Sequence, residues 1–143
     1  MAMENGIIEN ILTISSQCFS AKDQKKILND LSAREASVVI SLVQAEEKVS
    51  GNDLATRNKL SPSRMSRIVE SLVEKGYLVR EYSETDRRYI ELSLSQKGKD
   101  QRNEILSFNK ECENALRDRL SSSDLSIVEN AMEILIHAME KDK

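Results

Sequence analysis

Apolar residues recur three and four positions apart near both ends of the chain, a spacing that marks one face of a helix. This pattern predicts a helix over residues 4–20 and two long helices within residues 96–140. The apolar positions of the two long helices are Ile105, Phe108, Cys112, Leu116 and Leu120, followed by Leu125, Val128, Met132, Leu135 and Met139. The polar segment 21–31 is either a connector or a short exposed helix.

Helix start signals occur three times in the middle of the chain. Ser32 with Glu35 fits a capping box, in which each side chain accepts a hydrogen bond from a free backbone N–H. The inward positions of the helix that follows are Val38, Val39, Leu42 and Val43. Ser50 precedes a short helix over residues 52–57, and Ser61 precedes a longer one.

The longer helix begins with Pro62, runs to about Lys75 and has two different faces. Its inward face consists of Met65, Ile68, Val69, Leu72 and Val73. Its outward face consists of Ser63, Arg64, Ser66, Arg67 and Ser71. Small side chains allow close approach to DNA, serines bond phosphates, and arginine can contact both guanine acceptors. This face is typical of a recognition helix in a major groove, or of an ordinary helix with a solvated charged face.

After Gly76 the pattern changes to alternation, which predicts strands over Tyr77–Tyr82 and Tyr89–Leu94. Their connection carries Asp86, Arg87 and Arg88 at its tip. A hairpin beside a recognition helix lies near the adjacent minor groove, whose negative potential attracts arginine. Asp86 can hold the Arg88 guanidinium by a charge-assisted bond. Helix-turn-helix followed by hairpin is the order of a winged helix.

The motifs of residues 31–98 resemble those of the MarR family of winged-helix transcriptional regulators. The resemblance rests on LSARE, on LSPSRMSRIVESLVEKGYLVR and, most specifically, on DRRYIELSLSQKG. Two departures from the family pattern are small. Glu35 stands where a glutamine is common, and the wing loop lacks the frequent proline.

The resemblance implies a homodimer that binds double-stranded DNA at a pseudopalindromic operator. By the family pattern, the residues that face DNA are Ser61, Ser63, Arg64, Ser66, Arg67 and the wing-tip Arg88. We add the neighbouring wing-tip residues Asp86 and Arg87 to this set. The resemblance also implies a ligand-responsive repressor, whose effector is a small aromatic anion held between the dimer helices and the winged helix.

We therefore expect one domain over residues 1–143, mainly α-helical with a small β-hairpin wing, in the order α-α-α-α-β-β-α-α. Residues 32–94 form the winged helix-turn-helix lobe that binds DNA, and residues 4–20 and 96–140 form a helical dimerisation region. The apolar stripes of that region exceed what a small three-helix core with a hairpin needs, which supports a dimer. Only four glycines and one proline argue against a sandwich or barrel.

Charge is distributed unevenly along the chain. The net charge is −3 and the isoelectric point is near 5.3, unlike a uniformly basic DNA-binding domain. Residues 57–88, however, hold eight basic and five acidic side chains, a net charge of +3, which leaves −6 for the rest. A basic DNA-binding segment on an acidic body orients the dimer on DNA.

Two other functions remain open. A winged helix can serve as a protein-interaction module, although outward arginines on both helix and wing favour DNA. Cys18, at the end of the first predicted helix, is a candidate redox sensor, with Lys22 one turn on to lower the thiol pKa. No tyrosine lies between residues 19 and 76 to partner such a sensor, so we expect Cys18 to be a packing residue.

The remaining classes find little support. A single histidine, His137, and the absence of a CxxC pair predict no metal site. Isolated glycines make no phosphate-binding loop, and no catalytic constellation is visible, so we expect no cofactor and no enzyme activity. No signal peptide or bilayer-length apolar stretch is present, so we expect a cytoplasmic protein without a membrane partner.

Overall fold

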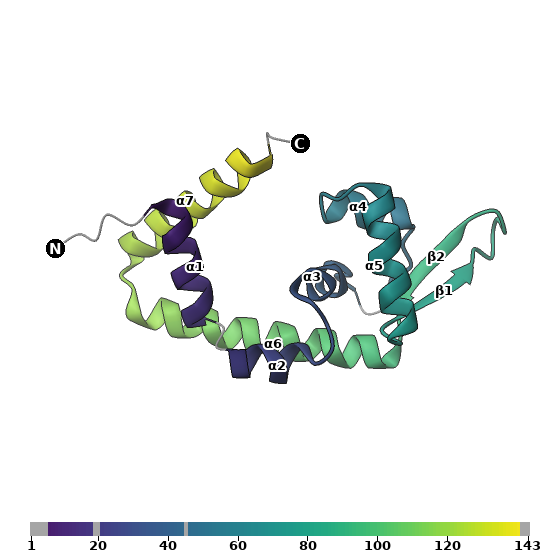
Figure 1. The fold of residues 1–143 in the computed structure, drawn as a ribbon, viewed down its shortest axis with the longest axis horizontal. Helices are drawn as coiled ribbons and strands as arrows, with labels where there is room; N and C mark the ends of the chain where they lie inside the picture. The colour runs from purple at the N-terminus through teal and green to yellow at the C-terminus, as the bar shows by residue number, and fades with distance from the viewer. Residues whose placement is uncertain (1–5, 19–20, 45, 141–143) are drawn as a thin grey trace. The chain divides into compact units, whose positions relative to one another are not determined.

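The computed structural model describes residues 6–18, 21–44 and 46–140. The chain divides into two compact units, residues 1–108 and 109–143, and each is described by itself. The elements, labelled in Figure 1, are α1 (Ile7–Cys18), α2 (Ala21–Leu28), α3 (Ala33–Ser41), α4 (Gly51–Arg57), α5 (Pro62–Glu74), β1 (Leu78–Tyr82), β2 (Ile90–Leu94), α6 (Gln96–Arg119) and α7 (Ser122–Glu140).

The predicted mainly helical fold with one antiparallel hairpin is confirmed. The polar segment 21–31, for which two alternatives were open, forms a helix, α2. Five described helices therefore precede the hairpin, one more than the predicted order has. The physical reason is that lysine and glutamine are good helix formers, while Ile27 and Leu28 pack against the core from one face.

The winged-helix lobe, residues 32–94, has a closed apolar core. Its fully buried side chains are Val38, Val39, Leu42, Leu54, Met65, Leu72 and Tyr77, while Leu78, Leu92 and Leu94 of the hairpin are at most 5% exposed. The predicted burial of Val43 is wrong, since its side chain is 68% exposed. Because α3 ends at Ser41, helical spacing no longer directs the residues that follow it. Val49 enters the core instead and pairs with Leu92 through two backbone hydrogen bonds.

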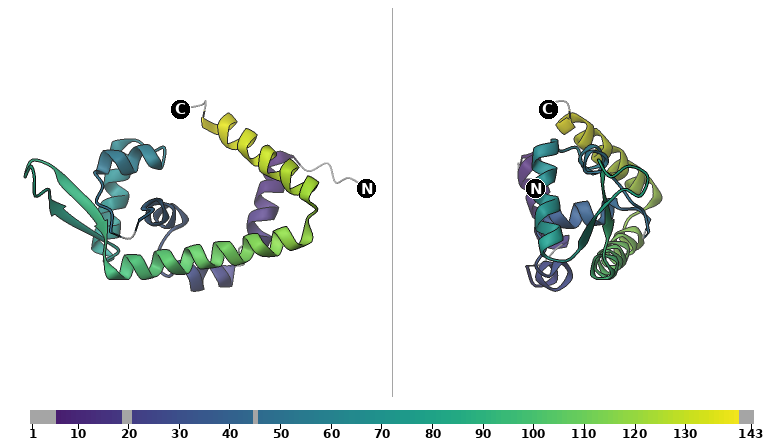
Figure 2. Two further views of the ribbon diagram at one scale, coloured as in Figure 1. Left: turned by 180° about the vertical axis from the view of Figure 1, so that it is seen from behind. Right: turned by 90° about the vertical axis from the view of Figure 1, so that its right-hand side faces the viewer.

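The hairpin is a regular antiparallel pair in which Leu78 lies opposite Leu94 and Tyr82 lies opposite Ile90. Figure 2 shows it from two further sides, next to α5. Leu92 and Leu94 are buried as the alternation predicts, whereas Ile90, nearer the tip, is 43% exposed. Alternation thus predicts the face correctly, but distance from the core decides how far each residue is covered.

The start of α6 is fixed against the segment that follows α5. The Ser95 hydroxyl donates to the carbonyl oxygens of Gly76 and Tyr77, and accepts from the N–H of Gly98. A Cβ atom on Gly98 would lie 2.1 Å from the Tyr77 carbonyl oxygen, so only glycine allows this approach. Gly76 itself has φ of 85°, the left-handed conformation that glycine adopts readily after the end of a helix.

The unit of residues 109–143 contrasts with the lobe in having an uncovered apolar surface. No residue of α7 is buried, although its spacing is helical throughout. Arg117 joins the end of α6 to α7 through ion pairs with Glu113 and Glu129, at 2.8 and 2.9 Å. Of the helices in the described part of the chain, none has both the length and the apolar character to cross a membrane.

Candidate nucleic-acid interface

Local signals position α5 as the second helix of a helix-turn-helix. The Ser61 side chain accepts a hydrogen bond from the N–H of Arg64, and Pro62 occupies the first turn. The turn from α4 is closed by Lys59, whose φ of 54° is left-handed, and by a bond from the N–H of Leu60 to the Ala55 carbonyl oxygen. The predicted cap is therefore present, and it fixes where the helix begins.

The face of α5 opposite the core carries the residues predicted to contact DNA. All five side chains lie exposed along the first half of the helix, namely Ser61, Ser63, Arg64, Ser66 and Arg67. Within the described residues, neither Arg64 nor Arg67 forms an ion pair, so both guanidinium groups are available to a ligand. Ser71 differs from its predicted outward position: it is half-buried and donates to the Glu35 carboxylate at 2.6 Å.

The wing tip holds the second predicted group. Arg88 donates from Nε and Nη2 to the two carboxylate oxygens of Asp86, at 3.0 and 2.8 Å. The backbone N–H of Arg88 also donates to Asp86 at 3.1 Å. These bonds lower the pKa of Asp86 and raise that of Arg88. The guanidinium stays 84% exposed, so the carboxylate orients it without covering it. Arg87 is exposed beside it.

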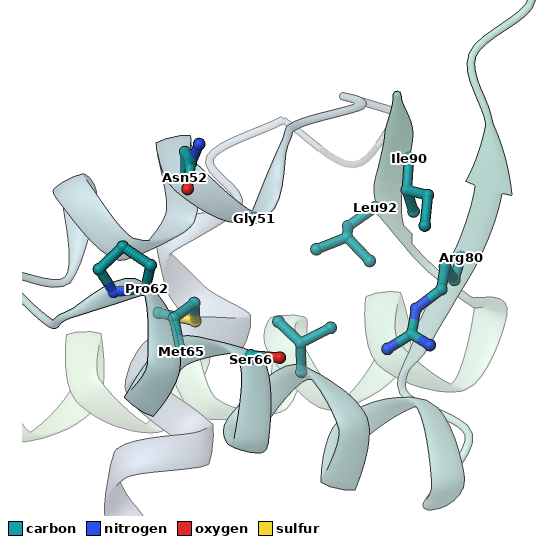
Figure 3. Close-up of a pocket in the computed structure, with 9 residues that line it drawn as sticks. Gly51, Asn52, Pro62, Met65, Ser66, Arg80, Ile90 and Leu92 are labelled. Carbon is teal, nitrogen blue, oxygen red and sulfur yellow. The ribbon is translucent and has the colours of Figure 1, made fainter. Parts of the chain in front are cut away.

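A groove of about 380 Å³ separates α5 from the wing (Figure 3). Buried Met65, Val69 and Leu92 line its apolar part. Ser66 from α5 and Arg80 from β1 add polar groups, and Figure 3 shows Arg80 extending from the strand toward the helix. Sequence reasoning missed Arg80 as an interface residue. The sequence signal that could have found it is its position two residues after Leu78, which places an arginine on the same face of the strand as a core residue.

The other candidate residues do not form a site among the described residues. Cys18 is the last residue of α1, and its side chain lies outside the described residues. Cys112 is half-buried on α6, as its place on the apolar stripe predicts. His137 is exposed, with Nδ1 3.9 Å from a Glu140 oxygen. Across residues 6–18, 21–44 and 46–140, no group of three histidine, cysteine or acidic side chains is placed to hold a metal ion.

Comparison with known proteins bears on the same lobe. A model of the MarR family matches residues 29–88. These residues, less than half of the chain, are similar to that family. The match contains both the recognition helix and the wing tip, so the resemblance drawn from the sequence motifs is confirmed. Among curated protein sequences, none matches the chain.

Solved MarR-type structures share the fold over nearly the whole chain. The structure of Streptococcus pneumoniae FabT in complex with DNA has a TM-score of 0.71 and 22% identity, covering 96% of this chain and 92% of that one. The S. aureus MepR-DNA complex has a TM-score of 0.72 and 18% identity, covering 94% and 99%. The adhesin competence repressor AdcR from Streptococcus pyogenes has a TM-score of 0.71 and 18% identity, covering 95% and 99%.

Proposed function

We propose that this chain is a sequence-specific DNA-binding transcriptional regulator that acts as a homodimer on a pseudopalindromic operator. One observation carries the proposal: the winged-helix lobe presents two unpaired guanidinium groups on α5 and a third, held by Asp86, at the wing tip. The DNA present in the FabT and MepR structures, which share this fold, supports it.

In the proposed complex, α5 enters a major groove. Ser61, Ser63 and Ser66 allow close approach and bond phosphates, while Arg64 and Arg67 contact base edges. The wing lies along the neighbouring minor groove, where Arg88 enters the negative potential and Arg87 contacts the backbone. Asp86 holds the Arg88 guanidinium in one orientation, so less side-chain entropy is lost on binding.

The dimer is proposed because large apolar side chains of the outer helices α1 and α7 are exposed among the described residues. On α1, Ile7, Ile8 and Leu12 are each more than 60% exposed. On α7, Ile127, Ile134, Ile136 and Met139 are each more than half exposed. A second copy is the partner that would bury both surfaces. Two-fold symmetry then places the two recognition helices about 34–36 Å apart, or a multiple of this.

The regulatory part of the proposal follows the family resemblance. We propose a repressor, free of catalysis, that releases DNA when a small aromatic anion binds between the dimer helices and the lobe. A role on chromosomal DNA puts the chain in the cytoplasm.

The test is selection of DNA by the full-length protein from a library of randomised duplexes. We expect a pseudopalindromic sequence to be enriched. Arg67→Ala should then weaken binding to the selected duplex about tenfold, the size of one lost base contact. The matched control is Arg119→Ala, which removes an exposed arginine from the last turn of α6. Absence of enrichment, or equal effects of the two substitutions, would overturn the proposal.

A further inference from the structure

A buried carboxylate lies behind the recognition helix. The Glu35 side chain is 9% exposed and both of its oxygens are fully used. Oε2 accepts from the Ser32 N–H at 2.7 Å and from Lys75 Nζ at 2.9 Å. Oε1 accepts from the Ser71 hydroxyl at 2.6 Å and from the same ammonium at 3.1 Å. Burial acts to raise the pKa of Glu35, but these bonds outweigh it and lower that pKa to about 2.

Two of the three donors to Glu35 come from α5 and the residue that caps its C-terminus. Ser71 and Lys75 are four residues apart, and Arg67 precedes Ser71 by another four, so the three lie along one side of α5. The same side of α5 therefore exposes Arg67 near the middle of the helix and is bonded to Glu35 of α3 near the C-terminal end. Lys75 is held in turn, because its Nζ also donates to the Asp30 carbonyl oxygen at 2.7 Å.

The inward face of α5 carries Met65, Val69 and Leu72, whose apolar contacts have no preferred direction. Hydrogen bonds are directional, and a buried carboxylate that loses a donor is costly. A rotation of α5 would break the bonds from both Ser71 and Lys75 to Glu35.

We propose that Glu35 is a positioning residue, which fixes the rotation of α5 through Ser71 and Lys75 and thereby the direction in which Arg64 and Arg67 point. The inference rests on the proposed DNA-binding function. It makes Glu35, which never touches DNA, a determinant of which DNA sequence is bound. Base contacts carry the sequence information and phosphate contacts do not, so a turned helix should lose specificity before it loses binding to any duplex.

The experiment compares binding to the duplex selected by the wild type with binding to a shuffled duplex of equal length and composition, at one salt concentration. Specificity is measured as the dissociation constant for the shuffled duplex divided by the dissociation constant for the selected duplex. Glu35→Gln should lower this ratio about tenfold, equivalent to one misdirected base contact, with little change in binding to the shuffled duplex. The ratio should not change in Ser32→Ala, which removes the cap on α3 but leaves both bonds to α5.

Ser71→Ala is the second variant, since it keeps the ion pair to Lys75 and threatens the fold less. It should lower the ratio about threefold, and should add nothing to Glu35→Gln in the double variant, because both act through one carboxylate. An unchanged ratio in Glu35→Gln, or an equal fall in Ser32→Ala, would overturn the positioning role. If Glu35→Gln does not fold, the ratio in Ser71→Ala decides. A wild type that selects no sequence would instead contradict the proposed function.

Discussion

Helices α5 and α7 have the same kind of apolar periodicity and opposite burial. On α5, Met65 and Leu72 are 1% and 0% exposed, because α3, α4 and the hairpin close over them. On α7, Val128 and Met132 of the predicted stripe are 41% and 42% exposed, and no residue of the helix is buried. Periodicity therefore predicts the helix and its apolar face. Which surface covers that face depends on contacts with other elements or with a second chain, and periodicity does not predict these.

Because of this difference, the lobe and α7 should be stabilised in different ways. Each buried aliphatic side chain of the lobe contributes about 1.5–3 kcal/mol within one copy. The apolar positions of α7 contribute only when another surface covers them, so we expect the stability of that region to rise with the logarithm of protein concentration.

The largest expected effect is on the dimer. Met132→Lys places a charge on the α7 stripe, where Met132 is 42% exposed in a single chain. We expect monomers in sedimentation or light scattering, and an affinity for the selected duplex lower by about 10²–10⁴-fold, because two linked half-site contacts become one. Val43→Lys, at the 68% exposed site in the lobe, is the control and should stay dimeric. A dimeric Met132→Lys would place the interface elsewhere.

The next effect is on the core of the lobe. Leu72→Ala removes a fully buried side chain and should cost about 2–5 kcal/mol in chemical denaturation, at any protein concentration. Leu116→Ala, at a site 47% exposed on α6, should cost about 0.5 kcal/mol or less in dilute solution, and more as concentration rises. If the two substitutions had equal costs that did not depend on protein concentration, both side chains would be buried within a single chain, and the contrast between the two regions would fail.

Acid should destabilise the lobe through Glu35. The folded protein keeps this group ionised down to a pKa of about 2, against an ordinary value of 4.5. Its contribution is therefore fully present above pH 4.5 and is lost as pH falls from there to about 2. Glu35→Gln should lose roughly 3 kcal/mol less than the wild type over that interval, measured by denaturant titration at each pH. Equal losses of unfolding free energy on acidification in the wild type and in Glu35→Gln would contradict this.

A smaller effect is expected at the wing tip. Arg88→Ala should weaken binding to the selected duplex by about 1–3 kcal/mol, as measured by fluorescence anisotropy at fixed salt. Asp86→Asn keeps the arginine but loosens its bidentate support, so it should cost less than Arg88→Ala. Unchanged affinity in Arg88→Ala would remove the wing tip from the interface.

The smallest effect concerns Cys18. Binding to the selected duplex should survive both organic peroxide and Cys18→Ser, because we expect a packing cysteine rather than a sensor. Gel-shift titration with and without peroxide checks this. Release of DNA by peroxide from the wild type but not from Cys18→Ser would establish the redox alternative.

The candidate interface was largely predictable because its signals are local. Ser61 and Pro62 predict where α5 begins, and the alternation after Gly76 predicts the hairpin. The bond between Asp86 and Arg88 spans two residues and follows from their spacing. Arg80 and Ser71 were misjudged because their neighbours, Ser66 across the groove and Glu35 on α3, are distant in sequence.

The sequence by itself determined the helices other than α2, their caps, the hairpin and, apart from Ser71, the side of α5 that meets solvent, since these depend on residues within a few positions of each other. Only the tertiary structure decided that α2 is helical, that Val49 replaces Val43 in the core, and that Glu35 joins Ser71 and Lys75. Such outcomes are set by contacts between segments far apart along the chain. A buried carboxylate is stable only where folding brings its donors to it.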